Sequence, residues 1–115
     1  MIIIKGFVIK GQQLGRKMGF PTANIDAHEK SVENGVYRSK VRIDGKSYRA
    51  MTNVGLRPSV DGRTRLLEAH LFDFDGDLYG QCIQVELLEK IRDEKKFATI
   101  EELRAQLEID AELCR

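Results

Sequence analysis

Two alternating segments joined by a short turn signal constrain the fold of this chain more than any other feature. Residues 36–43, VYRSKVRI, alternate basic side chains with apolar or small ones, a pattern typical of a strand with one buried face. Asp44-Gly45 follows, a dipeptide typical of a two-residue hairpin turn. Residues 46–54, KSYRAMTNV, are expected to pair back antiparallel. The chain is therefore predicted to be built mainly from β-hairpins.

Three more segments have strand patterns between turn signals: residues 2–10, 64–74 and 82–91. At least five strands, mostly antiparallel, favour a small closed barrel or a sandwich. One helix is expected to end the chain. Thr99 and Glu102 have the spacing of a capping box. An apolar stripe at helical spacing, expected to pack on the barrel, consists of Ile100, Leu103, Leu107 and Ala111.

The length of 115 residues corresponds to one domain, and we expect residues 1–115 to form a single unit. The 19 basic and 18 acidic side chains nearly balance, which argues against coating nucleic acid or an anionic membrane. No apolar stretch reaches the ~20 residues that span a bilayer. Cys82 and Cys114 stand alone in the sequence, so both are expected to be reduced and structural. A cytoplasmic location follows from these expectations.

Residues 15–25, GRKMGFPTANI, suggest a site for phosphate and metal. Closely spaced glycines let backbone N–H groups approach an anion, and Arg16 and Lys17 add positive charge. Thr22 and Asn24 offer two neutral oxygens on one side of an extended chain, which suits Mg²⁺ bound to a phosphorylated substrate.

The glycines at 11, 15 and 19 match neither a P-loop nor the dinucleotide-binding motif. A plain flexible loop, or a turn in which Asn24 caps its own backbone, are the alternatives. Glu68 is a general base at a barrel mouth or a carboxylate on a solvated strand face. Arg92, after an apolar strand, could reach a planar ligand, or lie in a solvated charged loop.

These motifs together resemble the riboflavin kinase family, whose domain also forms the C-terminal half of bacterial bifunctional FMN/FAD synthetases. The resemblance spans nearly the whole chain. It rests on GFVIKGQQLGRKMGFPTANI, GVYRSKV, TNVGLRP, LLEAHLFDFDGDLYG and IRDEKKF, in the family's order.

The resemblance implies a six-stranded antiparallel, Greek-key-like β-barrel with a C-terminal helix. It implies transfer of the ATP γ-phosphoryl group to the 5′-hydroxyl of riboflavin, giving FMN and ADP, with Mg²⁺ or another divalent cation such as Zn²⁺ or Mn²⁺. Glu68 matches the catalytic carboxylate. The family's ATP-binding positions correspond to Gly11, Gly15, Arg16 and Thr22, its metal-side positions to Thr22 and Asn24, and its flavin-side positions to Arg92, Lys95 and Asn53.

A non-catalytic flavin- or nucleotide-binding barrel derived from the kinase is the alternative to an enzyme. We expect a monomer with no nucleic-acid or membrane partner. The segment is not expected to make FAD, because it contains no adenylyltransferase half.

Overall fold

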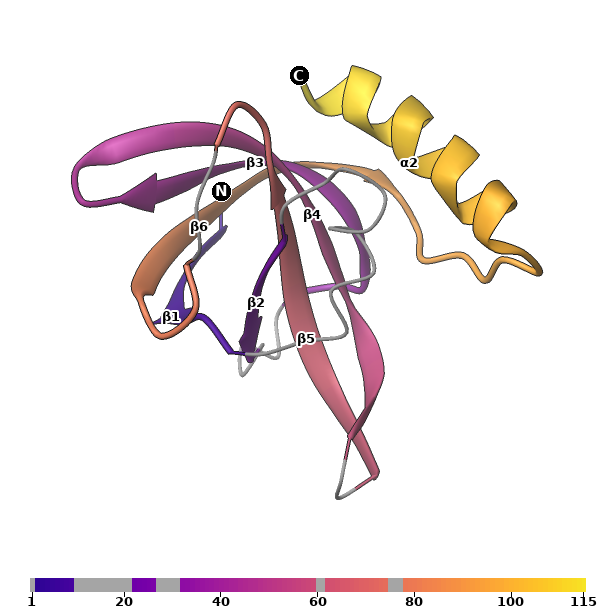
Figure 1. Cartoon of the computed structure of the whole chain (residues 1–115), viewed down its shortest axis with the longest axis horizontal. Helices are drawn as coiled ribbons and strands as arrows, with labels where there is room; N and C mark the ends of the chain where they lie inside the picture. Colours follow the sequence, from indigo (N-terminus) through magenta and orange to yellow (C-terminus); the bar gives the residue numbers. More distant parts are fainter. Residues whose placement is uncertain (1, 10–21, 27–31, 60–61, 75–77) are drawn as a thin grey trace.

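Six antiparallel strands form one sheet in the spatial order β1-β6-β3-β4-β5-β2, and a helix, α2, packs against its outside (Figure 1). The structure is a computed structural model that describes residues 2–9, 22–26, 32–59, 62–74 and 78–115. The elements are β1 (Ile2–Phe7), β2 (Thr22–Asp26), β3 (Gly35–Ile43), β4 (Lys46–Ser59), β5 (Gly62–Leu71), β6 (Cys82–Arg92) and α2 (Ile100–Cys114).

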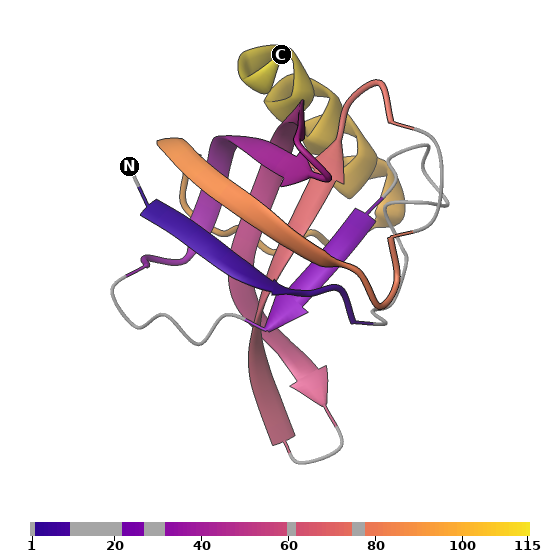
Figure 2. The same cartoon turned by 90° about the vertical axis from the view of Figure 1, so that its left-hand side faces the viewer.

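The two edge strands of this sheet meet, so that the sheet curls into a nearly closed barrel (Figure 2). The backbone N–H of Ile9, just after β1, donates to the carbonyl oxygen of Asn24 in β2 at 2.7 Å. The expected six-stranded antiparallel barrel with a C-terminal helix is therefore confirmed.

Alternation along each strand separates an interior face from an outer face. Tyr37, Ser39, Val41 and Ile43 of β3 point inward, as their spacing predicts. Two interior hydroxyls pair with each other, because Ser39 Oγ lies 2.6 Å from Thr52 Oγ1 and also donates to a backbone carbonyl. Fully buried side chains of the interior core include Ile25, Val41, Val54, Leu67, Ile83 and Val85.

The β3–β4 hairpin forms at the predicted turn. Asp44 and Gly45 have φ angles of 49° and 81°, both in the left-handed region that a two-residue turn of this kind requires. β4 continues beyond its expected end, to Ser59. β2, the sixth strand, has only five residues, and the alternation pattern does not predict it.

The helix α2 begins where the capping pattern predicts. The hydroxyl of Thr99 accepts the backbone N–H of Glu102 at 3.1 Å, and the Glu102 carboxylate accepts the N–H of Ala98 rather than that of Thr99. The inner side of α2 packs on the outer face of β3 and β4, as expected. The expected stripe is wrong at one end, because Ile100 is 59% exposed.

The two cysteines differ in environment. Both are free thiols, as expected, but only Cys114 is buried; Cys82 is exposed, so its expected structural role is wrong. Burial, with a contribution from nearby Asp110, raises the pKa of the Cys114 thiol to about 11. Within the described ranges, no helix has the length and hydropathy needed to cross a membrane.

Gly6 permits the close approach of β1 to β2. A Cβ atom at this position would overlap Cγ2 of Ile25, a side chain in the interior core. Gly6 therefore sets how closely the barrel can close, and with it the position of the strand that carries Asn24.

We expect Gly6→Ala to lower the free energy of unfolding by about 1–3 kcal/mol, because the added methyl group overpacks the contact with Ile25. Denaturant unfolding of Gly6→Ala, Ile25→Ala and the double variant measures this. The double variant should lose less stability than the sum of the two single losses. Strict additivity would contradict the close contact.

Candidate functional site

Three polar side chains form a row across adjacent strands. Asn24 in β2 pairs directly with Glu68 in β5, and Glu68 pairs directly with Asn53 in β4. Directly opposed residues of an antiparallel sheet point to the same face, at a strand spacing of about 4.8 Å. Their neighbours Ala23, Leu67 and Thr52 are fully buried or nearly so in the interior, so the row lies on the outer face.

The row continues to the segment that carries Arg92. Asn53 pairs with Val36 in β3, and Val36 pairs with Arg92 at the end of β6. Four strand spacings separate Asn24 from Arg92, about 19 Å along the curved sheet. Val36 is buried under α2, so the polar residues form two groups on either side of a covered apolar position.

The side chains of the first group differ in exposure. Asn24 is only 4% exposed, whereas Glu68 and Asn53 are partly exposed. The side-chain oxygen of Asn53 is buried and has no hydrogen-bond partner in the part of the chain that the structure describes. Leaving such an acceptor unsatisfied costs about 1–3 kcal/mol, so the site is suited to a ligand O–H or N–H donor at this atom.

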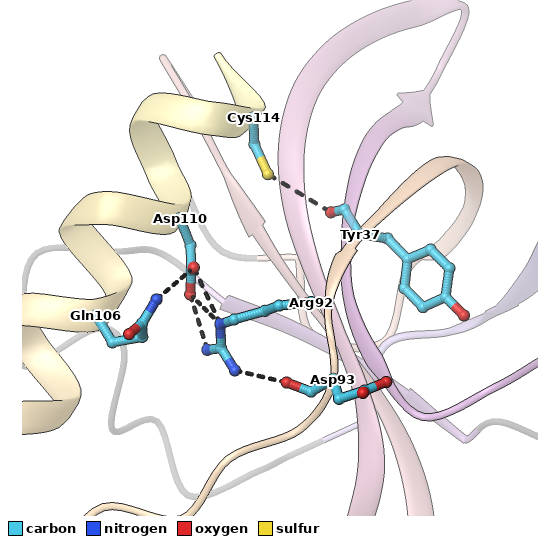
Figure 3. Close-up of polar contacts among 6 residues, drawn as sticks. All are labelled: Tyr37, Arg92, Asp93, Gln106, Asp110 and Cys114. Carbon is cyan, nitrogen blue, oxygen red and sulfur yellow. Dashed lines mark hydrogen bonds and ion pairs between the residues drawn. The ribbon is translucent and has the colours of Figure 1, made fainter.

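Arg92 is held by the helix (Figure 3). Its Nε donates to Oδ1 of Asp110 at 3.0 Å, and its Nη2 donates to Oδ2 at 2.8 Å. Gln106 Nε2 also donates to Oδ1 of Asp110 at 3.0 Å, while Arg92 Nη1 donates to the backbone oxygen of Asp93 at 2.9 Å. The Asp110 side chain is completely buried, so this is a bidentate ion pair that is largely shielded from water.

The charged segment after β6 also has local contacts. The Phe97 ring centroid lies 6.0 Å from the guanidinium carbon of Arg92 and 5.7 Å from Nζ of Lys95. Lys90 pairs with Asp93 at 2.7 Å and with Glu33 at 2.9 Å. The hydrogen bond to Asp93 is the main cause that raises the pKa of Lys90, and the same bond lowers the pKa of Asp93.

The structure tests the positions of some predicted site residues and not of others. Gly11, Gly15 and Arg16 lie outside the described residues. The backbone of Thr22 pairs with His70, but its side chain is not among those described. Of the two alternatives for Glu68, a barrel mouth and a solvated strand face, the structure shows the second: Glu68 is partly exposed on the outer face of the sheet, between two asparagines.

Asp110 and Gln106 were missed from the sequence. The sequence did contain a signal: Asp110 lies next to Ala111 on the expected buried side of the helix, and Gln106 precedes it by four residues. Spacing alone does not reveal the partner, because Arg92 lies on a strand and is brought to the helix only by the fold.

A shallow depression of about 330 Å³ lies elsewhere on the outside of the barrel. Lys5 and Arg42 flank Gln84 in register across three strands, and none of the predicted site residues lines it. Its other lining residues are Asp44, Gly45, Cys82 and Ile83.

The fold and the row define the class of molecule: a β-barrel domain with a candidate small-molecule site on its outer face. The family model described as riboflavin kinase matches residues 1–115. The chain belongs to the riboflavin kinase family.

Curated relatives agree with this family. The chain is 46% identical over 114 residues to a bifunctional riboflavin kinase/FMN adenylyltransferase of Haemophilus influenzae, covering 97% of this chain and 37% of that protein. It is 43% identical over 111 residues to the RNA-binding riboflavin kinase RibR of Bacillus subtilis, covering 96% of this chain and 48% of that protein. The chain thus spans less than half the length of these two relatives.

Solved structures share the fold. A Streptococcus pneumoniae crystal structure titled a macrolide-efflux protein superposes with a TM-score of 0.87 at 37% identity, over 98% of this chain and 38% of that one. A riboflavin kinase of Trypanosoma brucei gives a TM-score of 0.65 at 25% identity, over 98% of this chain and 76% of that one.

Proposed function

We propose that residues 1–115 form one riboflavin kinase domain, which transfers the γ-phosphoryl group of ATP to the 5′-hydroxyl of riboflavin and releases FMN and ADP. Membership of the family supports this proposal. The observation that carries it is the in-register row Asn24–Glu68–Asn53, with Arg92 farther along the same line. A base, a metal-side oxygen and flavin-side groups would then lie along one strip of the sheet.

Glu68 is the general base in this proposal. Phosphoryl transfer asks a protein mainly to position two substrates and to neutralise charge. The direct pairing of Glu68 with Asn24 places the two residues on the same face of neighbouring strands, whose backbones lie about 4.8 Å apart. A hydroxyl that donates to Glu68 would therefore lie beside the bound phosphates, and Glu68 would orient it and accept its proton.

Thr22 and Asn24 are the proposed ligands of a divalent cation. The amide oxygen of Asn24 is a hard donor at a nearly buried position, which fits Mg²⁺, and Mn²⁺ or Zn²⁺ are alternatives. When bound, the cation would offset the negative charge of the phosphates. Gly11, Gly15 and Arg16 are proposed to contact the phosphates of ATP.

The flavin would bridge the two polar groups, from Glu68 to Arg92, passing beside Val36, which α2 covers. Three strand spacings, about 14 Å along the sheet, separate these residues, enough for a sugar-alcohol chain and part of a fused ring system. The unpaired oxygen of Asn53, one strand away from Glu68, would accept a hydrogen bond from the flavin, either from a hydroxyl of the sugar-alcohol chain or from an N–H of the ring. Arg92 and Lys95, beside Phe97, would contact its planar surface.

A non-catalytic flavin- or nucleotide-binding barrel remains the second candidate. Binding alone does not require a carboxylate beside the metal-side amide, and the pairing of Glu68 with Asn24 therefore favours the enzyme. The RNA-binding relative is more than twice as long as the segment it shares with this chain. Absence of nucleic-acid binding, a monomeric state and a cytoplasmic location stay predictions.

Incubation of the purified protein with riboflavin and MgATP, followed by chromatography of the flavins, tests the proposed function. FMN and ADP should form in equal amounts, and FAD should not form. Other nucleoside triphosphates in parallel reactions identify the phosphoryl donor. No FMN from any donor would leave the binding barrel as the better description.

Glu68→Gln should lower kcat by about 10²–10⁴-fold, because the amide cannot accept the hydroxyl proton. Binding of MgATP, measured by calorimetry, should change little. Glu86→Gln is the matched control, since Glu86 lies on another part of the outer face and pairs with Ile3 and Lys40. Equal kcat for Glu68→Gln and the parent would remove Glu68 from the mechanism.

Asn24→Ala should raise the Mg²⁺ concentration required for half-maximal FMN formation, because one oxygen donor is lost. Titrations with Mg²⁺ and Mn²⁺ at saturating riboflavin measure the change. Asn34→Ala removes an amide that accepts from Arg65 at 2.8 Å, away from the row, and serves as control. An unchanged metal requirement in Asn24→Ala would count against this ligand.

A further inference from the structure

Asp110 is a buried carboxylate on α2 that accepts hydrogen bonds from Arg92 and Gln106. The residue is 0% exposed and lies on the inner side of α2 with Leu107 and Ala111. Both of its oxygens accept from Arg92, and Gln106, one helical turn earlier, donates to one of them. A buried charge needs such complete pairing to be tolerated.

These contacts determine the orientation of the Arg92 guanidinium. Nε and Nη2 form the edge that faces the helix, and Nη1 is held by the carbonyl oxygen of Asp93. Bonds at the edge and at Nη1 fix the plane of the group, while the flat faces take no part in these bonds. Phe97 lies near the guanidinium, 6.0 Å from ring centroid to Cζ.

We infer that Asp110, supported by Gln106, is a positioning residue that orients Arg92 for stacking against a planar fused-ring ligand. The inference rests on the proposed function, in which that ligand is riboflavin. Asp110 acts through Arg92 and does not itself contact the ligand, since its side chain is sealed between helix and sheet. The C-terminal helix is then part of the machinery that sets flavin affinity.

A purely structural role for Asp110 predicts a different outcome. If the ion pair only fastens α2 to the barrel, its loss should lower the thermal midpoint and affect riboflavin and MgATP alike. If Asp110 orients Arg92, riboflavin affinity should fall selectively. The two readouts, stability and substrate selectivity, separate the alternatives.

Asp110→Asn and Gln106→Met are the test variants, and Glu108→Gln, an exposed change on the same helix, is the matched control. Each test variant should raise the KM for riboflavin by about three- to tenfold, the scale of one weakened hydrogen bond. The KM for MgATP and kcat should stay within about twofold, a change that corresponds to less than half of one such bond. Gln106→Met carries the test if Asp110→Asn fails to fold.

A double-mutant cycle tests whether Asp110 acts through Arg92. In an Arg92→Ala background, Gln106→Met and Asp110→Asn should no longer alter riboflavin affinity, because the group they orient is gone. Equal effects in both backgrounds, or equal losses for both substrates, would overturn the inference.

Titration of riboflavin fluorescence without ATP separates failure of this inference from failure of the proposed function. If the parent protein binds riboflavin but makes no FMN, the proposed function fails. The double-mutant cycle can then still be measured, with dissociation constants for riboflavin in place of KM values. If the parent binds no riboflavin, both fail. If FMN forms and the variants bind riboflavin as the parent does, the inference alone is wrong.

Discussion

The in-register pairing of β2, β5 and β4 is the constraint on which the rest of the site depends. It aligns Asn24, Glu68 and Asn53 on one face, and a slip of one residue would turn every side chain of the shifted strand to the other face. Ala23 and Ala69 are the sequence neighbours of Asn24 and Glu68 on the inward face, and both are small and fully buried. The tightly filled interior around them disfavours such a slip. Packing inside the barrel therefore positions the polar residues of the candidate site on its outer face. The close approach at Gly6 extends this control to the edge of the sheet, because it lets β1 lie against β2.

The helix α2 makes two different contacts with the barrel. Leu107, Ala111 and Cys114 pack on Val36 and Met51, a contact driven by removal of apolar surface from water. Asp110 adds a buried ion pair with Arg92. This pair orients the Arg92 guanidinium but adds little net stability, because the cost of removing both charges from water offsets much of their attraction. Apolar contact holds the helix on the sheet, and the ion pair determines how a single guanidinium is turned. The proposed flavin side depends on the second contact, which no hydrophobic pattern would reveal.

Local signals predicted much of the fold from the sequence. The Asp44-Gly45 turn, the alternation in β3 and the Thr99 cap depend on neighbouring residues, and each is confirmed. The five-residue β2 and the pairing of Asn24 with Glu68 depend on strands far apart in the chain, so no local pattern contains them. Glu68 was identified as a candidate, but its location beside two asparagines required the register. Asp110 was missed for the same reason, because its partner lies on another element. The phosphate-loop residues Gly11, Gly15 and Arg16 stay predictions.

The outer location of the polar row has a consequence for how the domain can change. Where α2 does not cover the sheet, inward residues such as Ala23, Leu67 and Thr52 fill the core, and their neighbours Asn24, Glu68 and Asn53 face the candidate site. A substitution at a partly exposed outward position there should affect ligand contacts more than packing. Ligand preference could therefore be retuned at outward positions such as Asn53 while the inward set is left as it is. Laboratory libraries restricted to outward positions that α2 leaves uncovered should keep most members folded, which makes this barrel a favourable scaffold for altering which ligand it binds.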